Sequence, residues 1–170
     1  MSNVAVERVR DGDATPPALC ERMKAISDRI ERRAFEVFER RGCAADHSLD
    51  DWLQAERETV RTPDVELIEK DGKFQVRLAA PAYDLKDIRV TAMPTALIVH
   101  AESKHGRQKH EGDVYLCEFG RRDLYRRLDL PAPINVDKVS ASFEDGILQL
   151  TAPKTADPAN KLKALGAGRF

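Results

Sequence analysis

The strongest structural signal in the chain is the stretch Val139-Ser-Ala-Ser-Phe-Glu-Asp-Gly-Ile-Leu-Gln-Leu-Thr-Ala-Pro-Lys154. Val139, Ala141 and Phe143 alternate with polar residues, and a short apolar segment follows Asp145-Gly146. Asp-Gly is the dipeptide most typical of a two-residue turn between antiparallel strands. Residues two apart in a strand share one face. The stretch therefore predicts two strands that each bury one face.

The same period of two extends towards the amino end as far as Asp64, with a second turn signal at Asp71-Gly72. Seven or eight short apolar segments recur about every ten residues over 63–154, with no helical pattern between them. Spacing of this kind predicts an antiparallel β-sandwich or a β-barrel.

Before Pro63 the pattern has a helical period instead. Thr15-Pro16-Pro17 suits a helix start, and Gly42 suits a helix end. Ser48-Leu-Asp-Asp51 resembles a capping box that opens a second helix. We therefore expect a helical hairpin over 15–62. The apolar face of its first helix consists of Leu19, Met23, Ile26, Ile30, Ala34, Val37 and Phe38.

The two ends of the chain lack such periodicity. Residues 1–14 are polar and small, and residues 155–170 are polar and rich in Ala and Gly. We expect a disordered leader and a flexible tail. The large aromatic residues of the hairpin, Phe35, Phe38 and Trp52, are expected to be buried in it, against the sandwich or against another hairpin.

The charge composition argues against nucleic-acid and membrane partners. There are 28 Lys and Arg against 29 Asp and Glu, so no cationic excess attracts phosphate groups. The longest uncharged stretch, residues 90–101, is far shorter than the ~20 residues that span a bilayer. Three cysteines lie far apart with no Cys-x-x-Cys, which suits a reducing compartment. We expect a cytoplasmic protein.

No motif for catalysis, phosphate binding or a metal is present, so we expect neither an enzyme nor a cofactor. The spacing of the four histidines and Cys117 fits no common pattern of zinc ligands. The histidines are His47, His100, His105 and His110. The second helix opens with Asp50 and Asp51, which argues against a DNA-reading helix.

The stretch 139–154 resembles the end of the α-crystallin domain of small heat-shock proteins. Ala141, Gly146 and Leu148 have the spacing of the family's signature, and Pro153-Lys154 matches its usual close. Residues 73–81, 85–90 and 124–131 agree with further segments of the family in the same order. The resemblance covers about residues 64–154. It implies an immunoglobulin-like antiparallel β-sandwich, the α-crystallin domain, preceded by the helical hairpin.

A second resemblance covers the hairpin. Its ending, Asp51-Trp52-Leu53-Gln-Ala55-Glu56, is similar to that of a helical module of unknown function found in bacterial proteins. This resemblance suggests a bacterial source and supplies no activity.

The family resemblance implies an ATP-independent stress-response chaperone that holds partly unfolded clients. By analogy, clients would bind a groove between the strand at 88–90 and the strand at 139–143. The implied lining is Ile88, Val90, Val139 and Ala141, although alternating apolar residues of a sandwich are also ordinary core. The alternative function is an adaptor that uses the sandwich and the hairpin to bind one specific partner.

The resemblance also implies a homodimer formed by strand exchange through residues 103–123. Val114, Leu116 and Phe119 would belong to the exchanged strand, with Arg126 at the interface or simply exposed on its strand. The tail lacks the family's Ile-x-Ile/Val motif, which puts large oligomers in doubt. Val4-Ala-Val6 has the alternate spacing of such a motif, but the leader pattern favours disorder there.

Overall fold

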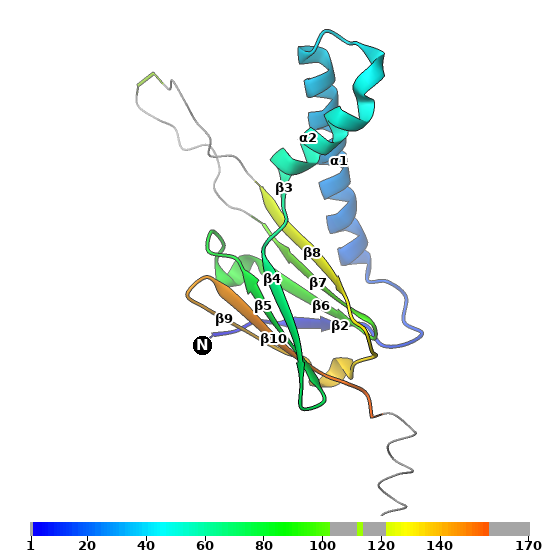
Figure 1. Ribbon diagram of the computed structural model, residues 1–170, viewed down its shortest axis with the longest axis vertical. Helices are drawn as coiled ribbons and strands as arrows, with labels where there is room; N and C mark the ends of the chain where they lie inside the picture. Colours follow the sequence, from blue (N-terminus) through cyan, green and yellow to red (C-terminus); the bar gives the residue numbers. More distant parts are fainter. Residues whose placement is uncertain (1, 103–111, 114–121, 157–170) are drawn as a thin grey trace, which may run out of the picture.

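The computed structural model describes residues 2–102, 112–113 and 122–156. They form a helical hairpin that stands above a sandwich of two five-stranded sheets (Figure 1). The first sheet has the order β1 (Ser2–Asn3), β9 (Ser140–Glu144), β10 (Ile147–Pro153), β5 (Lys73–Ala79) and β4 (Val65–Lys70). The second has the order β2 (Val6–Arg8), β6 (Ile88–Met93), β7 (Ala96–Ala101), β8 (Asp123–Asp129) and β3 (Val60–Arg61).

Within the described residues the predicted strands are present, and most pairs are antiparallel. The exceptions lie at the two edges of the second sheet, where β2 pairs in parallel with β6 and β3 pairs in parallel with β8. Three short 3-10 turns, η1 (Ala45–His47), η2 (Leu85–Asp87) and η3 (Val136–Lys138), complete the described elements. The fold is therefore the expected sandwich with a mixed second sheet.

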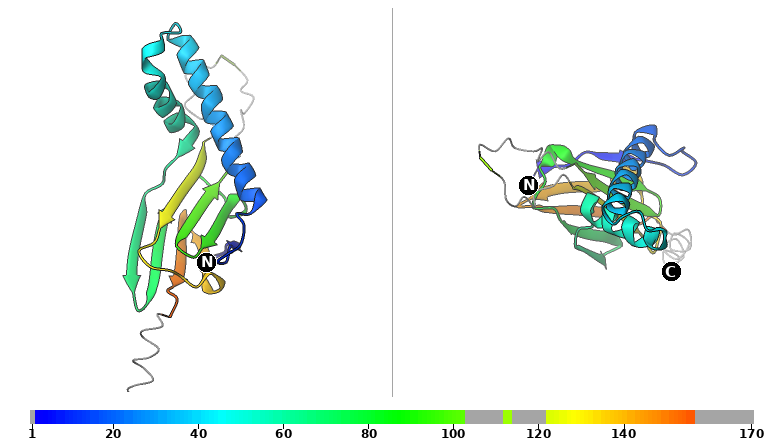
Figure 2. Two further views of the ribbon diagram at one scale, coloured as in Figure 1. Left: turned by 90° about the vertical axis from the view of Figure 1, so that its right-hand side faces the viewer. Right: turned by 90° about the horizontal axis from the view of Figure 1, so that it is seen from above.

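The hairpin consists of α1 (Pro17–Arg40) and α2 (Ser48–Thr59). Gly42 follows α1 with a φ of 86°, which suits the predicted glycine stop. Ser48 is the first residue of α2 rather than its cap, because η1 leads directly into the helix and His47 takes the cap position. The lower half of α1 runs along the outer face of the second sheet (Figure 2). As a result, β7 is buried along its whole length.

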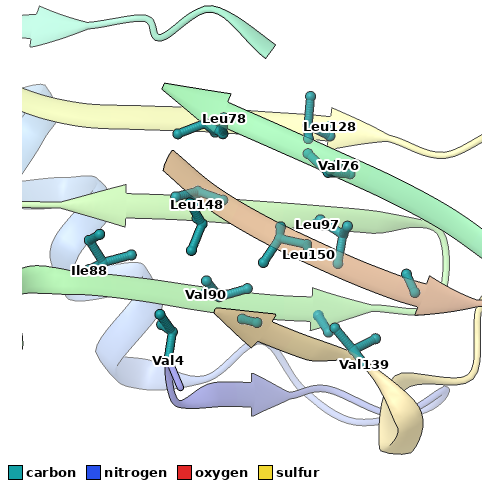
Figure 3. Packing of buried hydrophobic residues seen from close by; sticks show 14 of the residues in the cluster. Val4, Val76, Leu78, Ile88, Val90, Leu97, Leu128, Val139, Leu148 and Leu150 are labelled. Carbon is teal, nitrogen blue, oxygen red and sulfur yellow. The ribbon is translucent and has the colours of Figure 1, made fainter. Parts of the chain in front are cut away.

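The main core lies between the two sheets, where alternate residues of each strand meet (Figure 3). Phe74, Val76 and Leu78 of β5 are each 1% exposed, and Leu148 and Leu150 of β10 are similarly buried. A second, smaller cluster inside the hairpin contains Ile26, Ile30 and Ala55 and extends to Tyr125 of β8. The hairpin thus packs partly on itself and partly on the sandwich.

The signature glycine has a double role in the turn between β9 and β10. Asp145 and Gly146 both have positive φ, 50° and 76°, as a tight two-residue hairpin turn requires. A Cβ on Gly146 would lie 2.8 Å from the Cα of Pro81, closer than real Cβ atoms come to backbone. The Gly146 carbonyl also accepts a hydrogen bond from Ala80 N–H at 2.7 Å. Glycine at this position is required by conformation and by close packing.

The expectation of a disordered leader over 1–14 differs from the structure. Ser2 and Asn3 pair with Phe143 and Ser142 of β9, so the first residues extend one sheet. β2 then extends the other sheet by pairing with β6. The physical reason is that β9 and β6 would otherwise be open edges with unpaired backbone groups, and the start of the chain satisfies both.

Candidate peptide-binding groove

The four predicted groove residues come together at the side of the sandwich where β6 and β9 are neighbours across the core. Ile88 and Val90 lie on β6, Ala141 lies on β9, and Val139 directly precedes β9. All four belong to one core cluster and are between 1% and 6% exposed. They are buried in the core between the two sheets, and the start of the chain packs beside them, because Val4 belongs to the same cluster and Val6 pairs with Val90.

We call residues 2–9 the strap. Its central residue, Val4, is 7% exposed and belongs to the same core cluster. Figure 3 shows Val4 projecting from the N-terminal segment towards the layer of side chains that includes Val90. Val4 N–H donates to the Ala141 carbonyl at 3.0 Å, and Val6 stands in register with Val90. The strap therefore joins the first sheet at one end and the second sheet at the other.

The far end of the strap is anchored in the same way. Val9 is 3% exposed, and its N–H donates to the carbonyl of Ala92 at 2.9 Å. Arg8 extends across η3 and donates from Nε to the Val136 carbonyl at 3.1 Å and from Nη2 to the Val139 carbonyl at 3.2 Å. Arg8 thus fastens the strap to the loop that leads into β9.

Glu7 connects the strap to the hairpin. Its Oε2 lies 3.3 Å from Nη2 of Arg22 on α1 and accepts a hydrogen bond from Thr91 Oγ1 at 3.5 Å. Thr91 belongs to β6 and is 2% exposed. One carboxylate oxygen therefore has partners on α1 and β6, so the strap, the groove and the hairpin are in direct contact.

A buried polar cluster holds α1 against the sandwich. The side chain of Asp123 is 2% exposed and accepts hydrogen bonds from Arg29 of α1. His100 Nε2 lies 3.4 Å from the same carboxylate. Burial raises the pKa of Asp123, but the hydrogen bonds with His100 and Arg29 outweigh burial and leave that pKa below its ordinary value. The carboxylate is therefore ionised at neutral pH.

The same cluster borders a surface cavity of about 660 Å³ between α1 and the second sheet, lined by both acidic and basic side chains. His100 was one of the histidines considered as a metal ligand. Among the residues that the structure describes, no three His, Cys, Asp or Glu side chains are placed to hold a metal ion. His105 and His110 lie outside the described residues. The cluster of Arg29, His100 and Asp123 is therefore an ionic contact between α1 and the second sheet.

The predicted dimer residues fall mostly outside the described part of the chain. Val114, Leu116 and Phe119 lie in the range 114–121, which the structure does not describe. Arg126 lies on β8 opposite Val99, and its side chain is partly buried. Its Nε has no hydrogen-bond partner within the described ranges. Cys117 also lies outside them, while Cys20 and Cys43 are exposed.

The sequence did not single out two apolar surfaces that the structure exposes. Phe35 and Trp52 of the hairpin, expected to be buried, are 57% and 37% exposed, because the hairpin is only two helices thick. Leu49 and Leu53 are exposed with them; we call these four residues the hairpin patch. On the sandwich, Leu67 and Ile68 are exposed on the edge strand β4. Within the described residues, neither helix combines the length and hydropathy that a membrane span needs.

Two sheets packed face to face, with an extended segment lying between β6 and β9, define a β-sandwich of the α-crystallin type. The chain belongs to the Hsp20/alpha crystallin family, whose model matches residues 66–164. Residues 27–59 match a second model, described as a protein of unknown function (DUF2934). The resemblance of the sandwich to the α-crystallin domain is therefore confirmed. The resemblance of the hairpin to a module of unknown function is also confirmed.

Curated relatives and a solved structure agree with this assignment. The small heat shock protein C2 of Rickettsia felis is 27% identical over 92 residues, which cover 54% of this chain and 60% of the relative. The chloroplastic heat shock 22 kDa protein of Chlamydomonas reinhardtii is 29% identical over 97 residues, covering 56% and 62%. Heat shock protein 16.0 from Schizosaccharomyces pombe superposes with a TM-score of 0.50 at 25% identity, covering 56% of this chain and 88% of that one. The chain spans about 60% of the length of these curated relatives, and neither of their names denotes an enzyme.

Proposed function

We propose that this protein is a cytoplasmic, ATP-independent holdase that binds partly unfolded proteins and prevents their aggregation. One observation carries the proposal: the side of the sandwich between β6 and β9 already accommodates an extended segment with alternate valines, the strap. Main-chain hydrogen bonds hold it to both sheets, and Val4 fills an apolar site. This is how extended peptides are recognised when they add to a sheet edge.

The chemistry of unfolding clients matches such a groove. An unfolding protein exposes apolar side chains and strand edges with unpaired backbone groups. The groove offers apolar side chains, Val90, Val139 and Ala141, next to backbone edges of two strands. A client strand that replaced the strap would satisfy its own backbone and bury its own side chains there.

The direct test is light scattering of two unrelated heat-labile proteins at elevated temperature, with and without this protein, in the absence of nucleotide. We expect it to suppress the aggregation of both clients. If a folded sample protects neither client, the holdase proposal is wrong.

The groove itself is tested by Ala141→Asp, which places a carboxylate at a site that is 6% exposed and next to Val4. We expect this variant to protect clients less well. The matched control is Ser142→Asp, because residue 142 is the next on β9 and points to the other face. Equal protection by a folded Ala141→Asp chain would argue against the groove as the client site.

We further propose that the working unit is a homodimer formed through residues 103–123, with Val114, Leu116 and Phe119 in the exchanged strand and Arg126 near the interface. The open edge of β4, with exposed Leu67 and Ile68, supports the need for a covering partner. Deleting residues 103–119 should then yield monomers in size-exclusion chromatography with light scattering. A dimer that survives the deletion would contradict strand exchange.

The hairpin patch supports a second candidate, an adaptor that binds one specific protein. Four large apolar side chains of the two helices are between 37% and 69% exposed, and exposed apolar surface of this kind is typical of partner-binding sites. An adaptor would fail the two-client assay yet retain one partner through residues 15–62. A pull-down with the full chain, compared with a Phe35→Ser/Trp52→Ser chain, would separate this candidate from the holdase.

A further inference from the structure

We propose that the exposed face of the hairpin pairs with the same face of a second copy of this chain, so that α2 packs antiparallel on α2 about a twofold axis. The inference goes beyond the proposed function, because it involves neither the groove nor residues 103–123. The upper parts of α1 and α2 extend beyond both sheets, so a second hairpin can lie beside them (Figures 1 and 2).

The pairing face is a stripe along one side of α2 that is apolar except for one glutamate. Residues three or four apart lie on the same side of a helix. At these spacings the stripe contains Leu49, Trp52, Leu53, Glu56 and Val60. Leu49 is 69% exposed, the highest value among the large apolar side chains of the described residues. A helix buries such a stripe by packing it against another element, and here the outer side of α2 has none.

The carboxyl end of the stripe opens into an apolar pocket between the hairpin and the sandwich. The pocket has a volume of about 210 Å³, and its lining includes Glu56 and Val60 of the stripe, Met23 of α1 and Tyr125 of β8. Met23 is 43% exposed, so the pocket is open to the surface. An apolar cavity of about 150 Å³ can hold a benzene molecule, so this pocket has room for one leucine side chain.

The charged side chains beside the stripe are complementary to themselves. Asp50 precedes Leu53 by three residues and Arg57 follows it by four, so both lie next to Leu53 on the helix. Asp50 and Arg57 are equally far from a midpoint that lies just after Leu53. Asp46 and Arg61, further out along the chain, share the same midpoint. All four charged side chains are exposed.

An antiparallel twofold pair uses this order of charges. Each residue before the midpoint faces the residue of the second copy that lies equally far after it. Asp50 therefore faces Arg57 of the second copy, and the same contact occurs twice. A parallel pair would instead place aspartate against aspartate and arginine against arginine, which opposes that orientation.

The same axis brings the most exposed leucine to the pocket. Leu49 faces the segment of the second copy between Glu56 and Val60, which forms one wall of its pocket. One leucine enters each of the two pockets, as the symmetry requires. The two sandwiches lie at opposite ends of the paired hairpins, because each adjoins the carboxyl end of its own α2 through β3.

Exchange of charges in the full chain tests this arrangement. Asp50→Arg and Arg57→Asp each give one chain the same charge at both positions, so each variant repels a second copy of itself. In a mixture of the two variants, the positive charges of one face the negative charges of the other. Both positions are exposed, so the fold is retained.

Pairing is measured by fluorescence energy transfer between donor-labelled and acceptor-labelled chains. The exposed Cys43 carries the label, in a background where Cys20 and Cys117 are serine. We expect each variant alone to pair at least about tenfold more weakly than the unchanged chain, and the mixture to come within about threefold of it. No transfer in the unchanged chain, equal transfer in all three samples of single chains, or a mixture as weak as either variant would overturn the proposal.

The pocket is tested separately by Leu49→Ser, which removes the side chain that enters it. We expect pairing to weaken about tenfold or more, because two leucines lose their burial in each pair. Gln54→Ser is the matched control, since Gln54 is exposed on the same helix and donates a hydrogen bond to Glu58, away from the stripe. Equal pairing by the Leu49→Ser and Gln54→Ser chains would contradict the proposal.

Other occupants of the hairpin face give different outcomes. If charge exchange leaves energy transfer unchanged, while Phe35→Ser/Trp52→Ser abolishes binding of one protein in the pull-down, the face binds that protein and self-pairing is wrong. If pairing follows the charges but no form of the chain suppresses client aggregation, self-pairing stands and the holdase proposal is wrong.

Discussion

Arg29 of α1 donates hydrogen bonds through both terminal nitrogens of its guanidinium to the carboxylate of Asp123 on β8, 94 residues further along the chain. The Asp123 side chain is 2% exposed and the Arg29 side chain is 27% exposed. His100 of β7 lies against the same carboxylate. Together with the contact between Glu7 and Arg22 and the apolar cluster that reaches Tyr125, this pair joins the hairpin to the sandwich.

Asp123→Asn should destabilise the protein and loosen α1. The amide keeps the shape but removes the charge, so Arg29 loses a charged partner in a mostly buried site. Breaking such a pair costs about 1–3 kcal/mol when one partner remains partly solvated. Urea unfolding would measure the loss. Asp129→Asn is the matched control, since Asp129 is an exposed partner of Arg127 on the same strand and should change stability by less than about 0.5 kcal/mol. Equal effects of the two substitutions would contradict the role of Asp123.

The contribution of Asp123 should also depend on pH. Its pKa in the folded protein is below the ordinary value of 3.8, so the unfolded chain binds this proton more readily. The stabilisation is therefore complete above the unfolded pKa, near pH 4, and disappears as the pH falls through the lower folded pKa. We expect the difference in unfolding free energy between the unchanged chain and Asp123→Asn to be constant from pH 7 to pH 5 and to shrink below pH 4. A difference that stayed the same down to pH 2.5 would rule this out.

Gly146→Ala should be considerably more destabilising than Gly72→Ala. Both glycines occupy turns with positive φ, 76° and 72°, so both substitutions have the same conformational cost of about 1 kcal/mol. A Cβ on Gly146 would in addition meet the backbone of Pro81, whereas a Cβ on Gly72 would meet nothing within 4 Å. We expect about 1 kcal/mol for Gly72→Ala and roughly 2–4 kcal/mol for Gly146→Ala. Similar melting temperatures for the two variants would show that Pro81 moves aside freely.

The double variant Phe35→Ser/Trp52→Ser tests the function of the hairpin patch. Phe35 is 57% exposed but Trp52 is only 37% exposed, so the lost apolar burial should lower the unfolding free energy by roughly 1–3 kcal/mol and leave the chain folded. Because the proposed client site is the groove, we expect client protection in the light-scattering assay to be retained. Loss of protection from a stable double variant would move the client site from the groove to the hairpin.

The spacing of apolar residues predicted the helices and the longer strands. Burial repeats every three or four residues along a helix and every two along a strand, so it can be read from neighbouring residues. The apolar face of α1 contains Leu19, Ile26, Ile30 and Val37, which are buried as its three- and four-residue spacing indicated, whereas Met23 of the same face is 43% exposed. The strap was missed for a different reason. Its strands are two and three residues long, too short to show a period, and its partners are more than 80 residues away. The alternate spacing of Val4 and Val6 was the only signal that could have revealed it.

The sequence by itself determined the family and the order of the two helices and the longer strands, because turn chemistry and apolar spacing are local properties. The groove residues stay a prediction from the family resemblance. Only the tertiary structure decided that the chain's own start packs beside the groove, and that Phe35 and Trp52 stay exposed. Open strand edges must be paired by whichever segment can reach them, and a layer of only two helices cannot cover all of its apolar side chains. Both outcomes depend on which distant surfaces meet in space.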